Sequence, residues 1–156
     1  MAPMARSALT SAVFYRDPRA ALRFLEAAFG FELAMLIEDE AGNLIHSEMS
    51  FGDALIMIGP EFTADHQSPA SVGGKNTQTV HVHIDSDADA HCARARAAGA
   101  RIGREPADQH YGARVYTCAD LEGHQWSFSQ PVKAMSYEEM AQATGRKIET
   151  PDGAHG

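Results

Sequence analysis

The sequence predicts an α+β fold built from two similar βαβββ units. Residues 10–33 align with residues 79–102 at a constant offset, and Gly30 then corresponds to Gly99. In both segments a short strand pattern leads to an aspartate, a helical stretch and a glycine. Three further strand patterns follow each helical stretch, so each unit reads as one strand, one helix and a three-stranded meander.

The first unit opens with a strand that ends at Asp17, whose carboxylate can cap the next helix. Pro18 suits the first helical position, where a missing amide costs nothing. Leu22, Leu25 and Phe29 recur at helical spacing, so this helix face should cover a sheet. The three strands of the meander are then expected at residues 33–39, 44–50 and 54–59.

The second unit repeats this order with a thinner apolar helix face. Its first strand, residues 79–84, precedes Asp87, a second candidate for a helix cap. The apolar face of the following helix is expected at Ala90, Ala93 and Ala97, which are smaller than their counterparts in the first helix. The meander strands are expected at residues 101–106, 113–120 and 125–130.

Residues 1–156 are expected to form a single domain. A stretch rich in Pro, Gly, Ser and Asn separates its halves and reads as a linker. Ser136 and Glu139 match a capping box, so a short helix should run to about Ala143, and the polar residues after it are expected to fray. The divisions are residues 8–59 for the first half, 60–77 for the linker, 78–131 for the second half and 132–156 for the C-terminal helix and tail.

Composition narrows the range of partners. The formal net charge is −8 and no block of positive charge occurs, so we expect no binding to nucleic acid or to an anionic membrane. Because the chain shows neither a secretory leader nor a long apolar run, we expect a cytoplasmic protein whose partner is a small molecule or another chain. Cys92 and Cys118 show no redox spacing and read as free, buried thiols.

Two motifs in the second half point to a family. They are Tyr-Gly-x-Arg at residues 111–114 and Asp-x-x-Gly-His-x-Trp at residues 120–126, and they follow a first helix that ends in Phe-Gly-Phe. Over about residues 8–131 the sequence resembles the vicinal oxygen chelate superfamily of glyoxalase I, bleomycin-resistance proteins and extradiol dioxygenases. The resemblance implies curved sheets around a cleft, helices on the outside, and pairing of single-domain members as homodimers.

The resemblance also implies four metal-ligand positions, one on the first strand and one on the last strand of each half. In this chain they fall at Thr10, Ile56, Thr79 and Ser127. None is a His or Glu, although a divalent ion needs about three such side chains. We therefore expect no metal cofactor at these positions, and the glyoxalase I and ring-cleaving activities do not follow from the resemblance.

Strand alternation predicts which polar side chains face the cleft. Histidines alternate with Val and Ile in residues 79–84, and a His and a Glu alternate with apolar residues in 44–51. Arg114, the last residue of the Tyr-Gly-x-Arg motif, lies on an expected strand and can bind a ligand carboxylate or phosphate through its guanidinium. Its alternative role is a salt bridge to a nearby acid. The expected ligand-binding residues are His46, Glu48, His81, His83, Arg114 and Tyr116.

Other residues are expected to be structural. Trp126 and Phe128 have the alternation of core residues, and His124 reads as a turn or interface residue beside Gly123.

Three functions remain open on the sequence alone. The first is a homodimeric protein that binds and sequesters a small molecule, without a cofactor. The second is a lyase, isomerase or dioxygenase that uses His46, Glu48 or His83 as a catalytic base, or one divalent metal ion bound by His81 and His83 with His46 or Glu48. The third is an interaction module whose cleft no longer binds a ligand.

Overall fold

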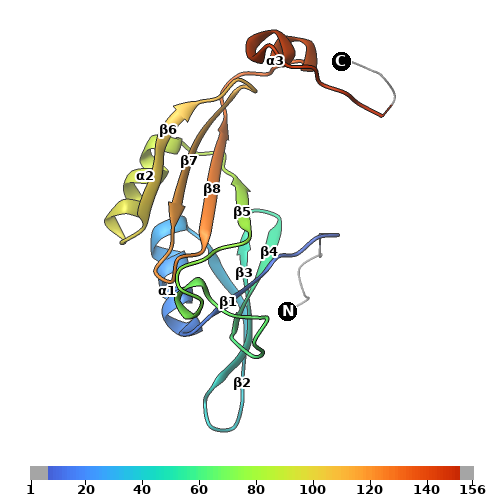
Figure 1. The fold of residues 1–156 in the computed structure, drawn as a ribbon. Coiled ribbons are helices and arrows are strands. Elements are labelled where there is room, and N and C mark those ends of the chain that lie inside the picture. The colour runs from blue at the N-terminus through green and yellow to red at the C-terminus, as the bar shows by residue number, and fades with distance from the viewer. Residues whose placement is uncertain (1–6, 152–156) are drawn as a thin grey trace.

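The computed structural model describes residues 7–151, so the expectations for residues 1–6 and 152–156 lie outside the described part. Each half follows the predicted order of one strand, one helix and three strands (Figure 1). The first half comprises β1 (Ala12–Tyr15), α1 (Pro18–Phe29), β2 (Glu32–Glu38), β3 (Leu44–Phe51) and β4 (Ala54–Pro60). The second comprises β5 (Thr79–His83), α2 (Ala88–Ala97), β6 (Arg101–Asp108), β7 (Ala113–Ala119) and β8 (Gln125–Pro131).

Each half contains one four-stranded mixed sheet. The strand orders are β1-β4-β3-β2 and β5-β8-β7-β6. The first strand of each half pairs in parallel with the last, and the remaining pairs are antiparallel. The predicted α+β class and the repeat are therefore confirmed. Between the sheets, the linker contains a short 3-10 turn, η1 (Pro69–Ser71), and an isolated β-bridge between Thr63 and His66.

The first helix forms as its sequence predicts. The Asp17 carboxylate accepts a hydrogen bond from the Ala20 amide at 3.0 Å, and Gly30 ends the helix in the left-handed conformation with φ of 80°. Its buried face includes Leu22, Leu25 and Phe29.

The second helix is capped by Asp87 as expected, but its buried face was predicted wrongly. Ala90, Ala93 and Ala97 are exposed. Because alanine methyl groups bury little area, they do not decide which face of a helix turns inward. The face is set by residues that contact α1 and the second sheet, namely Ala88, His91, Cys92 and Ala95.

One buried carboxylate, that of Asp120, joins the two halves. Its Oδ2 accepts hydrogen bonds from the Tyr15 hydroxyl at 2.6 Å and from the Trp126 Nε1 at 3.0 Å. Its Oδ1 accepts the backbone amides of Glu122 and His124, both at 3.0 Å. These bonds connect β1 of the first half to the turn before β8 of the second.

Two neighbours in the same turn strengthen this junction. The buried Glu122 carboxylate accepts the amides of Arg16 and Asp17 at 2.8 and 3.0 Å, just before α1 begins. The His124 Nε2 donates to the Phe14 carbonyl at 2.7 Å, so His124 is a turn residue that binds the other half, as expected.

A second junction forms around His91 of α2. The His91 Nε2 donates to the Phe29 carbonyl at 3.1 Å, so its Nδ1 accepts from the Tyr116 hydroxyl at 2.5 Å. The side chain of Arg94 donates to the carbonyls of Glu26 and Ala27 in the last turn of α1. Figure 1 accordingly shows α1 and α2 close together where the halves meet.

Aromatic residues fill the space between these junctions. The ring of Phe29 lies 5.2 Å from that of Trp126 and 4.6 Å from that of Phe128, measured between centroids. Trp126 and Phe128 are fully buried, which confirms their predicted core role. Cys92 and Cys118 are also free and buried, and burial raises the pKa of the Cys118 thiol to about 12.

The C-terminal segment leaves the sheets and ends in α3 (Tyr137–Thr144), which begins with the predicted capping box at Ser136 and Glu139. Among the described elements, none contacts α3, and Figure 1 shows it standing beyond the end of the second sheet. In residues 7–151 no helix has both the length and the apolar character needed to cross a membrane.

Replacing Asp120 with Asn should destabilise the protein by roughly 2–4 kcal/mol, because an amide NH₂ would face the Trp126 indole N–H, which can only donate. Urea unfolding followed by tryptophan fluorescence measures this difference. Asp85→Asn, at an exposed turn, is the matched control. Equal unfolding midpoints for the two variants would contradict the assigned role of Asp120.

The stability of the protein should fall as the pH is lowered below about 6.5, because burial lowers the pKa of His91 in the folded state. The unfolded chain then takes up a proton that the folded protein resists, whereas above this range His91 is neutral in both states. His91→Gln should cost roughly 1–3 kcal/mol at pH 7 and flatten this dependence. The check is urea unfolding between pH 5 and 7.5, with exposed His110→Gln as control; unchanged slopes for His91→Gln would refute it.

Candidate functional site

The face of the second sheet turned away from α2, here called its open face, carries the two histidines of β5. His81 lies beside Ser127 and His83 beside Ser129 in the parallel pairing of β5 with β8. The His81 Nδ1 and the Ser127 Oγ share a hydrogen bond of 2.8 Å. The two imidazole rings meet edge to face with centroids 5.0 Å apart. Strand alternation therefore placed both histidines correctly.

A hollow of about 490 Å³ lies over this open face. We call it the histidine hollow. Its wall comes from β5, β8, the turn before β7 and the segment after β8. The side chains that matter here are those of His81, His83, Tyr111, Ser129, Lys133 and Met135.

Partial burial, together with the neighbouring His83, lowers the pKa of His81. His81 is thus neutral at pH 7, with one ring nitrogen that donates and one that accepts. In the same hollow, Ser129 is buried and Tyr111 is about half exposed, with 48% of its surface accessible. The hollow therefore offers both donors and acceptors next to an aromatic ring.

His46 and Glu48 lie on the other sheet. The His46 Nε2 stands 3.4 Å from the Glu48 Oε1, and the Glu48 carboxylate is largely buried. In the pairing of β3 with β4 and β2, Glu48 lies beside Met57 and Met35. The histidine hollow includes neither His46 nor Glu48. The structure therefore does not bring His46 and Glu48 into one cleft with His81 and His83 within a single chain.

Two further expectations are corrected. Tyr116 is fully buried on the helix-covered face, where its hydroxyl donates to His91. Arg114 lies on the same face, and its guanidinium binds Asp89 of α2 and Asp108 of β6. Both residues follow the alternation of β7, which turns even-numbered side chains toward α2. The salt bridge considered as the alternative role of Arg114 is the one that forms.

The residues at the family's metal positions do not fit a divalent ion. Ile56 was assigned from its distance to Gly52, but it belongs to the core, and the register places Met57 beside Ala12 on the open face. None of Thr10, Ile56, Thr79 and Ser127 is a usual ligand of a hard divalent ion, and neither is Met57 next to Ile56. Within residues 7–151 no group of three His, Cys, Asp or Glu side chains is arranged to hold a metal, so His81, His83 and His46 are not assembled into a site in one chain.

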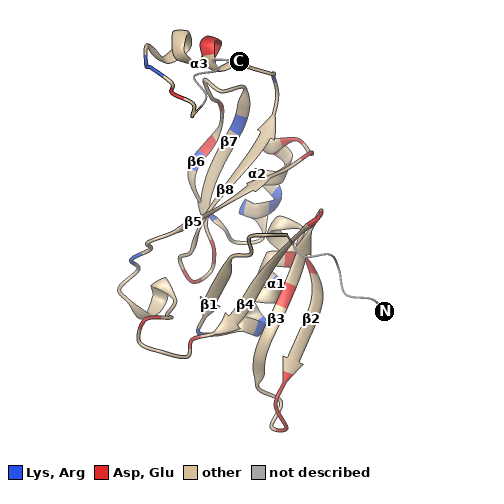
Figure 2. Ribbon diagram, turned by 90° about the vertical axis from the view of Figure 1, so that its right-hand side faces the viewer, with Lys and Arg blue, Asp and Glu red and all other residues tan. Residues whose placement is uncertain are grey.

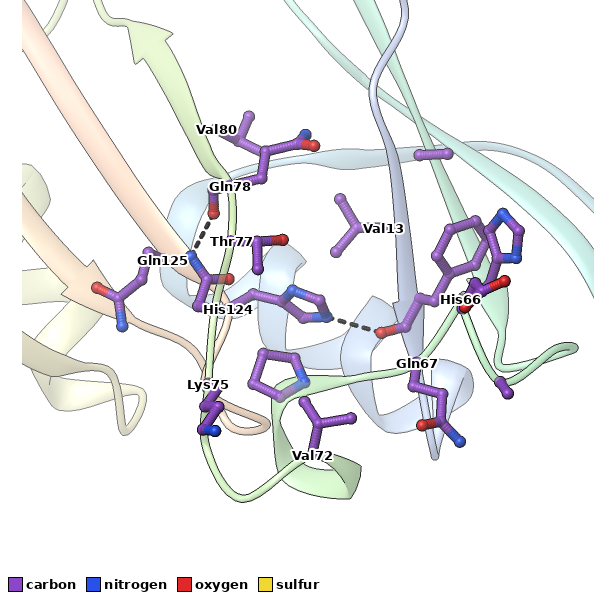
Figure 3. A pocket seen from close by; sticks show the side chains of 16 residues that line it. Val13, His66, Gln67, Val72, Lys75, Thr77, Gln78, Val80, His124 and Gln125 are labelled. Carbon is purple, nitrogen blue, oxygen red and sulfur yellow. Dashed lines mark hydrogen bonds between the residues drawn. The ribbon is translucent and has the colours of Figure 1, made fainter.

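A second hollow, of about 440 Å³, lies between β1, the linker and the turn before β8 (Figure 3). None of the six predicted site residues lines it. Its polar groups connect the linker and the two halves to one another. The His124 Nε2 donates to the Phe14 carbonyl, the Asn76 side chain to the Gln78 carbonyl, and the Gln78 side chain to the Ser11 hydroxyl. We therefore regard it as part of the junction between the halves.

Among the side chains singled out above in the histidine hollow, sequence reasoning did not find Tyr111, Ser129, Lys133 and Met135. Tyr111 stands in a motif that was recognised but was given no role. Ser129 shares the alternation of Ser127 and could have been found by it. Lys133 and Met135 follow the last strand, in a segment that shows no pattern of its own.

Comparison with known proteins identifies the family. Residues 8–128 match the model of the glyoxalase/bleomycin resistance protein/dioxygenase superfamily. Among curated proteins, the uncharacterized protein Rv0887c of Mycobacterium tuberculosis is 29% identical over 147 residues, which cover 92% of this chain and 85% of the relative. The uncharacterized protein Mb0911c of Mycobacterium bovis is also 29% identical over 147 residues, or 92% of this chain and 95% of the relative.

Solved structures agree with this assignment. TioX from Micromonospora sp. ML1 is 28% identical and superposes with a TM-score of 0.65, covering 81% of this chain and 99% of TioX. TnmS3 from Streptomyces sp. CB03234, described as an antibiotic binding protein, is 23% identical with a TM-score of 0.62, covering 82% and 98%. The chain therefore belongs to the glyoxalase/bleomycin resistance protein/dioxygenase superfamily.

Proposed function

We propose that this protein binds a small organic molecule in the histidine hollow and thereby sequesters it. The observation that carries the proposal is the arrangement of His81, His83 and the buried Ser129 in a hollow of about 490 Å³. A few placed polar groups within a concave surface are typical of ligand sites. That TnmS3, with the same fold, is described as an antibiotic binding protein supports binding as a use of this fold.

We also propose that the working unit is a cytoplasmic homodimer. The open face of the first sheet leaves Met35 36% and Ile37 45% exposed, next to His46 and Glu48. Exposed apolar side chains on one sheet face favour contact with another surface. A second copy that lays this face over the histidine hollow would bring His46 and Glu48 into the ligand site. The two free, buried cysteines suit a reducing compartment.

A catalytic role is the second candidate, because His46 and Glu48 already form a close pair at 3.4 Å. A carboxylate beside an imidazole can orient it as a general base. In such a dimer the pair would stand opposite His83, and His83 would contact the same ligand. The pair would then remove a proton from a ligand carbon next to a carbonyl.

Filling the histidine hollow should abolish ligand binding. We expect His83→Trp, whose indole occupies the hollow, to lose at least tenfold in affinity for any compound that raises the melting temperature of the wild-type protein in a small-molecule screen. Calorimetric titration measures the affinity. His110→Trp, an exposed histidine outside the hollow, is the control. Hits that bind His83→Trp as tightly as wild type would place the ligand elsewhere.

Metal analysis separates sequestration from metal-dependent catalysis. Protein purified without chelator and offered Zn, Ni, Mn and Fe(II) should retain far less than one ion per chain, because two adjacent histidines alone bind weakly. Elemental mass spectrometry gives the stoichiometry, with the His81→Ala/His83→Ala double variant as reference. About one ion per chain in wild type that is lost in the double variant would replace the first proposal by the enzymatic one.

A further inference from the structure

The segment that follows β8 is held over the histidine hollow by a single glycine. The amides of Val132 and Lys133 both donate to the Gly112 carbonyl, at 2.9 and 3.0 Å. Gly112 has a φ of +85°, and a Cβ added there would lie 1.9 Å from the Lys133 carbonyl oxygen. Only glycine allows this approach, because it favours positive φ and has no side chain.

This anchoring places Lys133 and Met135 in the wall of the histidine hollow. The match to the superfamily ends at residue 128, so both residues lie beyond the part of the chain that the family describes. They belong to the C-terminal segment, which adds two side chains to the wall of the proposed ligand site.

The basic residues near the histidine hollow differ in whether they are paired with an acid. Lys133 forms no ion pair with another described residue, whereas Arg114 at the neighbouring helix-covered face binds two aspartates. Among the described residues, the exposed Asp85 supplies the only carboxylate in the wall of the hollow. Figure 2 shows Lys and Arg spread over both halves, and the net charge is −8, so attraction of an anion must come from a local group.

The rest of the wall suits a flat, apolar body. Tyr111 exposes half of its surface, and Pro131 and Met135 add apolar side chains to the lining. Donors from His81, His83 and Ser129 stand on the opposite strands. An aromatic ring packed on Tyr111 would thus hold its substituents toward the histidines and Lys133.

We propose that Lys133 selects ligands that carry an anionic group, such as a carboxylate or sulfonate, on an aromatic body. This inference rests on the proposed function. Gly112 is the positioning residue of this selection, since it sets the path of the segment that bears Lys133. The anion takes the Lys133 ammonium as its partner and accepts hydrogen bonds from the histidine side.

Two fluorescent probes with the same ring system test this proposal. 8-Anilino-1-naphthalenesulfonate carries a sulfonate, and N-phenyl-1-naphthylamine lacks it. We expect wild type to bind the sulfonate more tightly, and Lys133→Met to weaken sulfonate binding about two- to fivefold, as for a partly exposed ion pair. Binding of the neutral probe should not change. Lys133→Arg should retain the preference, and Asp85→Asn should increase it.

Lys75→Met is the matched control, because Lys75 lines the other hollow. Gly112→Ala should lower sulfonate affinity although Lys133 is present, with unfolding curves to show that the fold persists. Suppose that His83→Trp blocks both probes but Lys133→Met leaves the preference for the sulfonate unchanged. The proposal that Lys133 selects anions is then refuted, and the proposed ligand site is retained. If His83→Trp blocks neither probe, the proposed function itself fails.

Discussion

The fold depends on the carboxylate of Asp120. Buried charges are costly unless every lone pair is used, and Asp120 accepts four hydrogen bonds, from Tyr15, Trp126 and two backbone amides. Because one donor comes from β1 and the others come from β8 and the turn before it, the carboxylate is satisfied only when the two halves are joined. Glu122 then caps the chain entering α1, so the start of the first helix depends on a residue of the second half.

This junction decides where a ligand can bind. It brings together the helix-covered sides of both sheets, where Phe29, Trp126 and Phe128 form one aromatic core. The His91 bonds to Phe29 and Tyr116 close the same side. Tyr116 and Arg114 bind partners on this helix-covered side and do not reach the open faces. The open face of the first sheet carries His46 and Glu48, and that of the second sheet carries His81 and His83.

The open faces differ in what they present. The first exposes Met35 and Ile37 around a His and Glu pair, and the second presents histidines, serines and, through the segment anchored on Gly112, a lysine. In the proposed homodimer these two faces would lie against each other at the ligand site. The positions that the resemblance assigned to metal ligands, Thr10, Ile56, Thr79 and Ser127, hold no His or Glu.

The sequence by itself determined the two βαβββ units, their caps at Asp17 and Asp87, and the side of β5 on which His81 and His83 lie, because these follow from local backbone preferences and from strand alternation. It failed for the buried face of α2, where alanines carry too little apolar area to decide. Alternation gave the relative faces within β7 but not which face is covered, so Arg114 and Tyr116 were placed on the wrong side. The separation of His46 from His81, and the approach of Lys133 to the histidines across Gly112, were decided only by the tertiary structure, because both depend on contacts between segments distant in the chain.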